Sequence, residues 1–185
     1  MNLNNEQRAA VHYDRHLSLA SCPGSGKTRT IVAKILRCLE SVRGTTRRIG
    51  CITYTNTAVN EIEHRLKRLG SRSDELFYEI STIHSFCLNH FLRTHHHLLA
   101  EFTNGFAIIT PDDPRWHEAV VQLIRRHGID GRRVDSFERI GRNPDGSILF
   151  PPEIGAAAAR EFVEFVDGNS RITFSDMVYY SLRLV

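Results

Sequence analysis

Several features are rare or missing in this sequence, and each absence excludes a class of protein. No window approaches the roughly 18 consecutive apolar residues of a membrane-spanning helix, so we expect no contact with a membrane. The N-terminal residues lack the basic-then-apolar layout of a secretory signal. No CxxC pair occurs, which argues against a zinc site or a disulfide framework. The four cysteines are Cys22, Cys38, Cys51 and Cys87. Together these absences predict a reduced protein of the cytoplasm.

Lysine is scarce as well, although the chain has 24 Lys and Arg residues. Lys27, Lys34 and Lys67 are the lysines, and the other basic residues are arginine. A lysine retained at position 27 against this background suggests a site that fits a compact ammonium better than a planar guanidinium. Lys27 belongs to the stretch SCPGSGKT, which is the most informative part of the sequence.

The stretch SCPGSGKT, residues 21–28, has the pattern of a phosphate-binding loop. Residues 16–20 before it alternate like the end of a buried strand, and residues 30–36 after it carry apolar side chains at helical spacing. A glycine-rich turn with a chance GKT is the alternative, and the flanking strand and helix patterns argue against it. The context therefore predicts a strand, a phosphate loop and a helix in succession.

Each position of the loop has a chemical role in this interpretation. Gly24 and Gly26 let the backbone wrap a phosphate at the positive end of a helix. Lys27 would reach the β- and γ-phosphates, and the Thr28 hydroxyl would hold Mg²⁺, so these two side chains are the catalytic candidates. The full ATP-binding set that we expect is Gln7, Ser21, Cys22, Pro23, Gly24, Ser25, Gly26, Lys27, Thr28 and Arg29.

Strands and helices alternate in the first half of the chain, which is typical of a parallel sheet covered by helices. Strands are expected over 49–54 and near 79–82, each followed by a helix. The second half reads as mainly helical, with helices reaching about His127, from Ala156 to Val166, and from a Thr173 or Ser175 cap to Leu184. Residues 128–150 are rich in Gly, Arg, Asp and Asn and are expected to form a loop or a weakly ordered segment.

Charge is distributed unevenly between the two halves. Residues 1–97 hold 14 Lys and Arg against 8 Asp and Glu, whereas residues 98–185 hold 10 against 13. A basic first half that carries the nucleotide loop is compatible with a polyanionic partner.

Polar and aromatic residues stand beside the loop or at expected strand ends. Gln7, just upstream of the loop strand, offers a donor and an acceptor that fit an adenine edge. Tyr54 could stack on a base, and Thr55 and Asn56 could bind phosphate. Thr82 and His84 follow the third strand in the same way. Each position also has a plain structural explanation: an amphipathic helix start, a strand-to-helix cap or a hydrogen-bonding histidine.

In this order, the segments resemble the UvrD/Rep group of superfamily 1 DNA helicases. LNNEQRAAV is similar to the glutamine motif, SCPGSGKT to motif I, ITYTNTAVNEI to motif Ia and STIHSFC to motif Ib. ITFSDMVYYSLRLV resembles the segment that the family carries shortly before motif II. The resemblance covers nearly the whole chain. Ser21 and Cys22 depart from the usual Ala and Gly, and Thr57 replaces a common lysine that would contact DNA.

The resemblance implies an α/β fold: an incomplete RecA-like P-loop NTPase sheet over residues 1–103, and part of a helical insertion subdomain over 104–185. It implies the N-terminal portion of an ATP-dependent 3′-to-5′ DNA helicase with ATP and Mg²⁺ as cofactors. By the same resemblance Gln7 would read adenine, and single-stranded DNA would be bound by Tyr54, Thr55, Asn56, Thr82 and His84. The acidic DExQD motif of the family would come after Val185, as would the second motor domain. The expected partners are therefore single-stranded DNA and that motor domain or a partner protein.

Two other functions stay open on the sequence alone. A non-catalytic nucleotide- or DNA-binding module that regulates a partner would also lack the acidic motif. A small-molecule kinase would also begin with a phosphate loop, and Arg125-Arg126 and Arg132-Arg133 could act as its lid. The kinase alternative leaves the TYTN and TIHSF segments unexplained. The run His95-His96-His97 is expected to be a solvated helix end, because consecutive helical side chains point about 100° apart and cannot share one metal ion.

Overall fold

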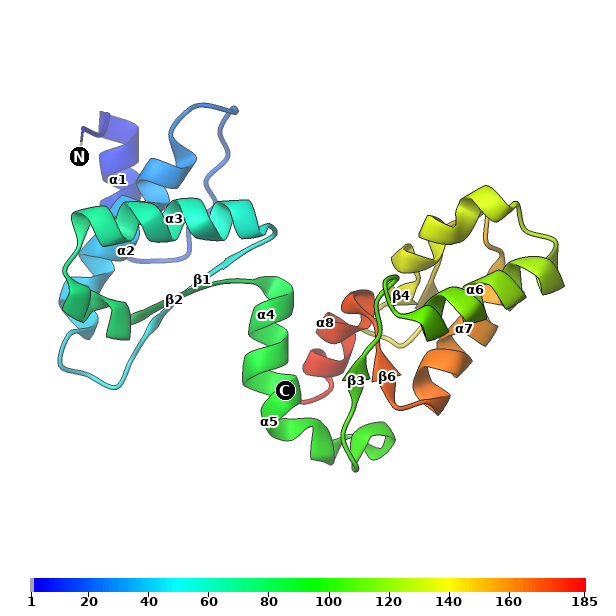
Figure 1. Ribbon diagram of the computed structural model, residues 1–185. Coiled ribbons are helices and arrows are strands. Elements are labelled where there is room, and N and C mark those ends of the chain that lie inside the picture. The colour runs from blue at the N-terminus through cyan, green and yellow to red at the C-terminus, as the bar shows by residue number, and fades with distance from the viewer. Residues whose placement is uncertain (1) are drawn as a thin grey trace. The chain divides into compact units, whose positions relative to one another are not determined.

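The computed structural model describes residues 2–185, and the chain divides into two compact units. The first ends at Ile83 and the second runs from His84 to Val185 (Figure 1). The division lies upstream of the boundary expected after residue 103, because the segment that follows His84 packs with the last helix of the chain. Within residues 2–185 no helix is both long enough and apolar enough to cross a membrane.

The first unit is built on one pair of parallel strands. Strands β1 (Ile49–Thr53) and β2 (Tyr78–Thr82) run in parallel, with Ile49 opposite Tyr78 and Thr53 opposite Thr82. The expectation of parallel strands at these positions is confirmed. The remaining elements of the unit are α1 (Asn5–His12), α2 (Lys27–Val42), α3 (Asn56–Leu69) and the short 3₁₀ helix η1 (Arg72–Leu76).

Helices α2 and α3 bury their apolar stripes against the strand pair. In α2 the buried residues Val32, Ile35 and Leu39 recur at the three- to four-residue spacing of one helix face. Ile62 and Leu66 do the same in α3. These side chains form one core with Tyr78 and Ile80 of β2. The core therefore sits between the helices and the sheet, and the loop that precedes α2 is held at its rim.

The strand predicted over residues 16–20 is wrong: this segment has no regular secondary structure and belongs to no sheet. A strand needs hydrogen bonds from a neighbour, and among the described residues β1 and β2 pair only with each other. The alternating leucines are consequently open to solvent, with exposed fractions of 50% for Leu17 and 41% for Leu19.

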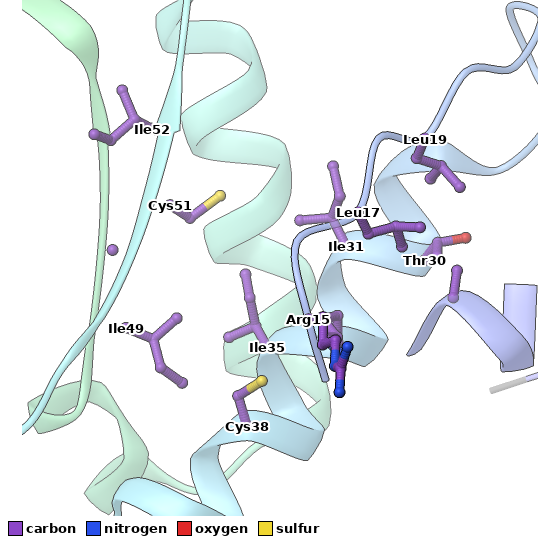
Figure 2. A pocket seen from close by; sticks show the side chains of 13 residues that line it. Arg15, Leu17, Leu19, Thr30, Ile31, Ile35, Cys38, Ile49, Cys51 and Ile52 are labelled. Carbon is purple, nitrogen blue, oxygen red and sulfur yellow. The ribbon is translucent and has the colours of Figure 1, made fainter. Parts of the chain in front are cut away.

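An apolar groove of about 480 Å³ lies beside this segment (Figure 2). Leu17 and Leu19 line one side, Ile31 and Ile35 of α2 form another, and Cys51 of β1 closes it. Exposed apolar surface of this kind is a typical site of association. The edge of β1 that does not face β2 opens into the same groove, so unpaired strand hydrogen-bonding groups and apolar side chains occur together.

The second unit has a helical core with two small sheets. Its helical elements are α4 (Ile83–Cys87), the π-helical turn η2 (Leu88–Leu92), α5 (Arg93–His95), η3 (His96–Leu98), η4 (Ala100–Phe102), α6 (Pro114–His127), η5 (Gly131–Arg139), α7 (Ala156–Gly168) and α8 (Phe174–Leu182). Strands β3 (Ala107–Ile108) and β6 (Arg171–Ile172) pair in parallel. Helices α6 and α7 pack through Trp116 and Phe162, whose rings meet edge to face. Thr173 caps α8, which was one of the two expected caps.

Residues 128–150, expected to be a loop, contain regular structure. They include η5 and an antiparallel hairpin of β4 (Gly141–Arg142) and β5 (Ile148–Leu149). The turn closes because Gly146 adopts a φ of 87° and its N–H donates to the Asn143 carbonyl. Turn chemistry was visible in the sequence, but strands of two residues are too short to show an alternating pattern.

A buried ion cluster joins this hairpin to the helices of the second unit. Arg142 donates to Asp167 at 2.5 Å and pairs with Asp176 at 3.0 Å, and the Tyr180 hydroxyl donates to Asp167. Burial raises the pKa of Asp176 to about 6, and the nearby Arg142 limits the rise. A carboxyl whose folded pKa lies above its unfolded value binds protons better when folded, so its contribution to stability falls as pH rises through that range.

Asp176 is therefore expected to make the second unit more stable, relative to the Asp176→Asn variant, as pH falls from 7 to 5. The relative gain should be about 1 kcal/mol, since one pKa unit corresponds to about 1.4 kcal/mol. Urea unfolding followed by the fluorescence of buried Trp116 measures it. Asp130→Asn is the control, because the Arg132 side chain lowers the pKa of Asp130 and its titration lies below this window. A difference that does not change with pH would contradict the assignment.

The groove beside residues 16–20 should make the isolated 185-residue chain bind an apolar dye and self-associate. Replacing both Leu17 and Leu19 with Ser is expected to reduce dye binding severalfold with little loss of thermal stability, because exposed leucines contribute little to folding. Leu149→Ser is the matched control, since Leu149 of β5 is 49% exposed but lies outside the groove. Equal dye binding by the double variant and its parent would show that the groove is not the adhesive surface.

Candidate nucleotide and nucleic-acid site

The glycine-rich loop has the backbone that its sequence requires. Gly24 and Gly26 have φ values of 79° and 91°, which other residues rarely adopt. Gly26 is the N-cap of α2, and a Cβ placed there would lie 2.8 Å from Nε2 of Gln7. The backbone conformation thus favours glycine at both positions, and a Cβ at Gly26 would also displace the Gln7 amide. The loop delivers its N–H groups to the positive end of a 16-residue helix, which favours an anion.

The Lys27 side chain holds the loop closed by binding backbone carbonyls of the loop. Its ammonium donates to the carbonyl oxygens of Ser21 and Cys22 at 2.6 and 2.9 Å. The Ser25 hydroxyl donates to that of Ser21 at 2.8 Å, which braces the same turn. The three bonds leave Lys27 at the first turn of α2, where a phosphate bound by the loop would meet it.

The other predicted loop residues lie on the same surface. Cys22 and Pro23 are exposed, and Thr28 is half-buried in the first turn of α2. Arg29 is exposed and donates to the Asn2 carbonyl at 3.2 Å. The loop residues lie on one continuous turn, and Lys27, Thr28 and Arg29 continue it into α2.

Gln7 lies against the loop, as its predicted role requires. Its Nε2 donates to the Ser25 carbonyl at 2.9 Å, and its Oε1 accepts from the Asn4 backbone N–H at 3.1 Å in a capping box of α1. A primary amide has two donors and two acceptor lone pairs, so one of each remains for a ligand. The two internal bonds orient the amide and leave it able to meet the donor and acceptor of an adenine edge.

A small hollow of about 130 Å³ joins these groups. It is lined by Asn4, Glu6, Gln7, Leu19, Ala20, Ser21, Ser25, Lys27 and Thr30. Four of the residues predicted as ATP-binding, Gln7, Ser21, Ser25 and Lys27, are therefore brought together from separate stretches of sequence around one concave surface.

The donor set fits part of a magnesium site. Mg²⁺ prefers oxygen ligands and keeps several waters when it binds together with substrate phosphates. The Thr28 hydroxyl in the first turn of α2 is one such oxygen. Among residues 2–185 no group of three or more His, Cys, Asp or Glu side chains is arranged to hold a metal ion.

Tyr54 stands at the carboxyl end of β1, with 86% of its surface exposed. Thr55 is the N-cap of α3, and its hydroxyl accepts from the Ala58 N–H at 3.2 Å, so the structural explanation of this residue is confirmed. Asn56 is exposed in the first turn. Tyr54 thus presents an exposed aromatic face directly before the N-terminus of α3.

Thr82 is the last residue of β2 and lies beside the carboxyl end of β1, because its register partner is Thr53. Its surface is 9% exposed, so it is the most enclosed of the predicted DNA-binding residues.

His84 falls in the second unit, where its ring meets the ring of Phe174 edge to face at 5.9 Å. Phe174 is half-exposed and was not singled out from the sequence. From sequence, an aromatic residue at the start of a helix is ordinarily predicted to lie in the core. Only its exposure in the structure identifies Phe174 as a candidate contact residue.

Comparison with known proteins agrees with this geometry. The family model of the UvrD/REP helicase N-terminal domain matches residues 3–149. The ATP-dependent DNA helicase PcrA of Staphylococcus epidermidis is 29% identical over 99% of this chain, and PcrA of Staphylococcus aureus is 28% identical over 75% of it. A probable DNA helicase II homolog of Mycoplasma capricolum is 34% identical over 61% of the chain.

The chain spans 26% of the length of the S. epidermidis protein, and 18% and 15% of the other two. The match begins ahead of the glutamine-bearing helix α1 and extends through the phosphate loop and both strands of the parallel sheet. More than half of the sequence is covered, and the loop and its flanking helices have the geometry described above. The chain belongs to the UvrD/REP helicase N-terminal domain family.

Proposed function

We propose that this chain is the ATP- and single-stranded-DNA-binding N-terminal portion of an ATP-dependent 3′-to-5′ DNA helicase. The observation that carries the proposal is the convergence of Gln7 and Lys27 on one phosphate loop. The names of the relatives, which are ATP-dependent DNA helicases, support the same activity. The four cysteines are free thiols, which suits the reducing cytoplasm in which we place the protein.

In this proposal residues 1–103 belong to a RecA-like ATP-binding subdomain and residues 104–185 to part of a helical insertion. The single parallel pair of the first unit would be the portion of the RecA-like sheet that this chain contributes. The partner would be the second motor domain of the family or a separate protein. The free edge of β1 and the groove beside it supply a surface on which further strands could pair.

ATP would bind with its phosphates in the loop and its base toward α1. The N–H groups near Gly24 and Gly26 would receive the phosphates, and Lys27 would leave its loop carbonyls for the β- and γ-oxygens. Thr28 would ligate Mg²⁺, which neutralises charge on the transferred phosphoryl group when bound. Gln7 would hold the adenine edge with its remaining donor and acceptor.

Single-stranded DNA would cross the carboxyl ends of the two strands. Tyr54 supplies a stacking face, while Thr55 and Asn56 stand at a helix N-terminus suited to a phosphate. Thr82 lies beside them at the end of β2. In the second unit, His84 with the exposed Phe174 against it would itself offer an aromatic contact to DNA.

Lys27→Ala is expected to lower MgATP affinity at least about a hundredfold, because the loop loses the one cation aimed at the β- and γ-phosphates. Isothermal titration calorimetry measures the change. Lys67→Ala is the control, since Lys67 is an exposed lysine of α3 paired with Glu63. Affinity preserved within about threefold would contradict the site.

The isolated chain should hydrolyse ATP no faster than Lys27→Ala, because it lacks the acidic motif that positions the attacking water.

Tyr54→Ala is expected to weaken binding of single-stranded DNA roughly 5- to 150-fold, because stacking of a base on an aromatic ring is worth about 1–3 kcal/mol. Fluorescence anisotropy with a labelled oligonucleotide measures this, and affinity should fall steeply with salt. Tyr13→Ala is the matched control, because Tyr13 is a half-exposed tyrosine of the same unit away from the strand ends. DNA binding that is absent at low salt, or equal in both variants, would rule out this surface.

A further inference from the structure

Helix α1, which carries Gln7, has little to hold it in place by itself. It has eight residues, fewer than the roughly 12 to 15 that an isolated helix needs in water. Ala10 and Val11 are its buried residues, and both lie in its last turn. Apolar packing therefore anchors only the C-terminal part of α1, and its orientation depends on polar contacts with α2.

Those contacts come from two cations on the flank of α2. Lys34 donates to the backbone carbonyls of Val11, at 3.0 Å, and Tyr13. Arg37 donates to the same Val11 carbonyl at 3.0 Å and binds Asp14 through two bonds of 2.5 and 2.9 Å. The last carbonyls of a helix have no partner within the helix, and positive charge is favoured at that end. Lys34 and Arg37 thus cap the C-terminus of α1 from α2.

The two cations differ in what they can do. Arg37 directs two hydrogen bonds of its planar guanidinium at Asp14, whose side chain is 71% exposed. Lys34 directs its compact ammonium at two carbonyl acceptors, those of Val11 and Tyr13, and lies 3.8 Å from Asp14. It is one of only three lysines in a chain whose other cations are arginine. Three donors on one nitrogen suit this convergence better than a guanidinium does.

Towards its N-terminus, α1 contacts the phosphate loop through the Gln7 side chain. Nε2 of Gln7 is bonded to Ser25 and lies where a Cβ of Gly26 would be. A tilt of α1 about its C-terminal anchor would therefore strain this bond and change the direction of the Gln7 amide. Helix α1 is thus held at two places. Lys34 of α2 binds its C-terminal end, and the loop that precedes α2 binds Gln7 in its N-terminal half.

We propose that Lys34 is a positioning residue for base recognition, which sets the orientation of α1 and so aims the Gln7 amide at the base of the bound nucleotide. The inference rests on the proposed function of Gln7 and adds a residue that touches neither base nor phosphate. Lys34 acts on the base and not on the triphosphate, because the phosphate loop is braced separately by Lys27 and Ser25.

The test compares two ligands: MgATP, and inorganic tripolyphosphate with Mg²⁺, which has the phosphates but no base. In the 185-residue chain, Lys34→Met keeps the aliphatic stem and removes the ammonium. It should weaken MgATP about tenfold, the loss of roughly one well-made hydrogen bond, and leave tripolyphosphate within about twofold. Lys67→Met, on the exposed face of α3, is the control and should change neither ligand. Lys34→Gln, which keeps a donor without the charge, replaces Lys34→Met if that variant melts early.

A double-mutant cycle with Gln7→Ala separates positioning from general damage. If Lys34 acts through Gln7, the Lys34 substitution should have almost no further effect on MgATP affinity in the Gln7→Ala background. Additive losses, or equal weakening of MgATP and tripolyphosphate, would overturn the inference. So would unchanged MgATP affinity in a Lys34 variant when Gln7→Ala weakens it. Failure of the parent chain to bind either ligand would instead overturn the proposed function itself.

Discussion

The burial of one face of helix α2 is the constraint on which the rest of the first unit depends. Val32, Ile35 and Leu39 fix the axis of the helix against the parallel strands and α3. The glycine-rich loop and α1 are then placed relative to that axis. The phosphate loop is the N-terminal extension of α2, and the cations on its flank hold α1. A change that loosened this packing would move the loop, the glutamine and the edge of the sheet together.

The loop itself illustrates how ligand binding can be prepared by internal bonds. Lys27 and Ser25 are satisfied by atoms of the loop, and Gln7 is satisfied by the loop and by its own helix cap. Because these side chains are already held in place, they lose little conformational freedom when a ligand replaces their internal bonds. This is the advantage of preorganisation. Tyr54 differs from these groups, because 86% of its surface is exposed to solvent.

The second unit obeys a different constraint. Its apolar core is supplemented by Arg142, which sits between two carboxylates and a tyrosine and ties the hairpin to α7 and α8. Removing one partner of a buried ion pair is costly because it leaves the other charge without compensation. The cluster therefore makes the hairpin and the last helix of the unit interdependent.

The sequence by itself determined the local elements and the chemistry of the loop. The spacing of apolar residues predicted α2, α3, β1 and β2, and the glycine positions predicted a phosphate loop, because these depend on neighbours along the chain. Tertiary structure alone decided what depends on distant partners. Leu17 and Leu19 alternate like a strand but form none, since a strand exists only through its neighbour. The contact of Lys34 with the end of α1, and the exposure of Phe174, likewise follow from packing between segments that no local pattern encodes.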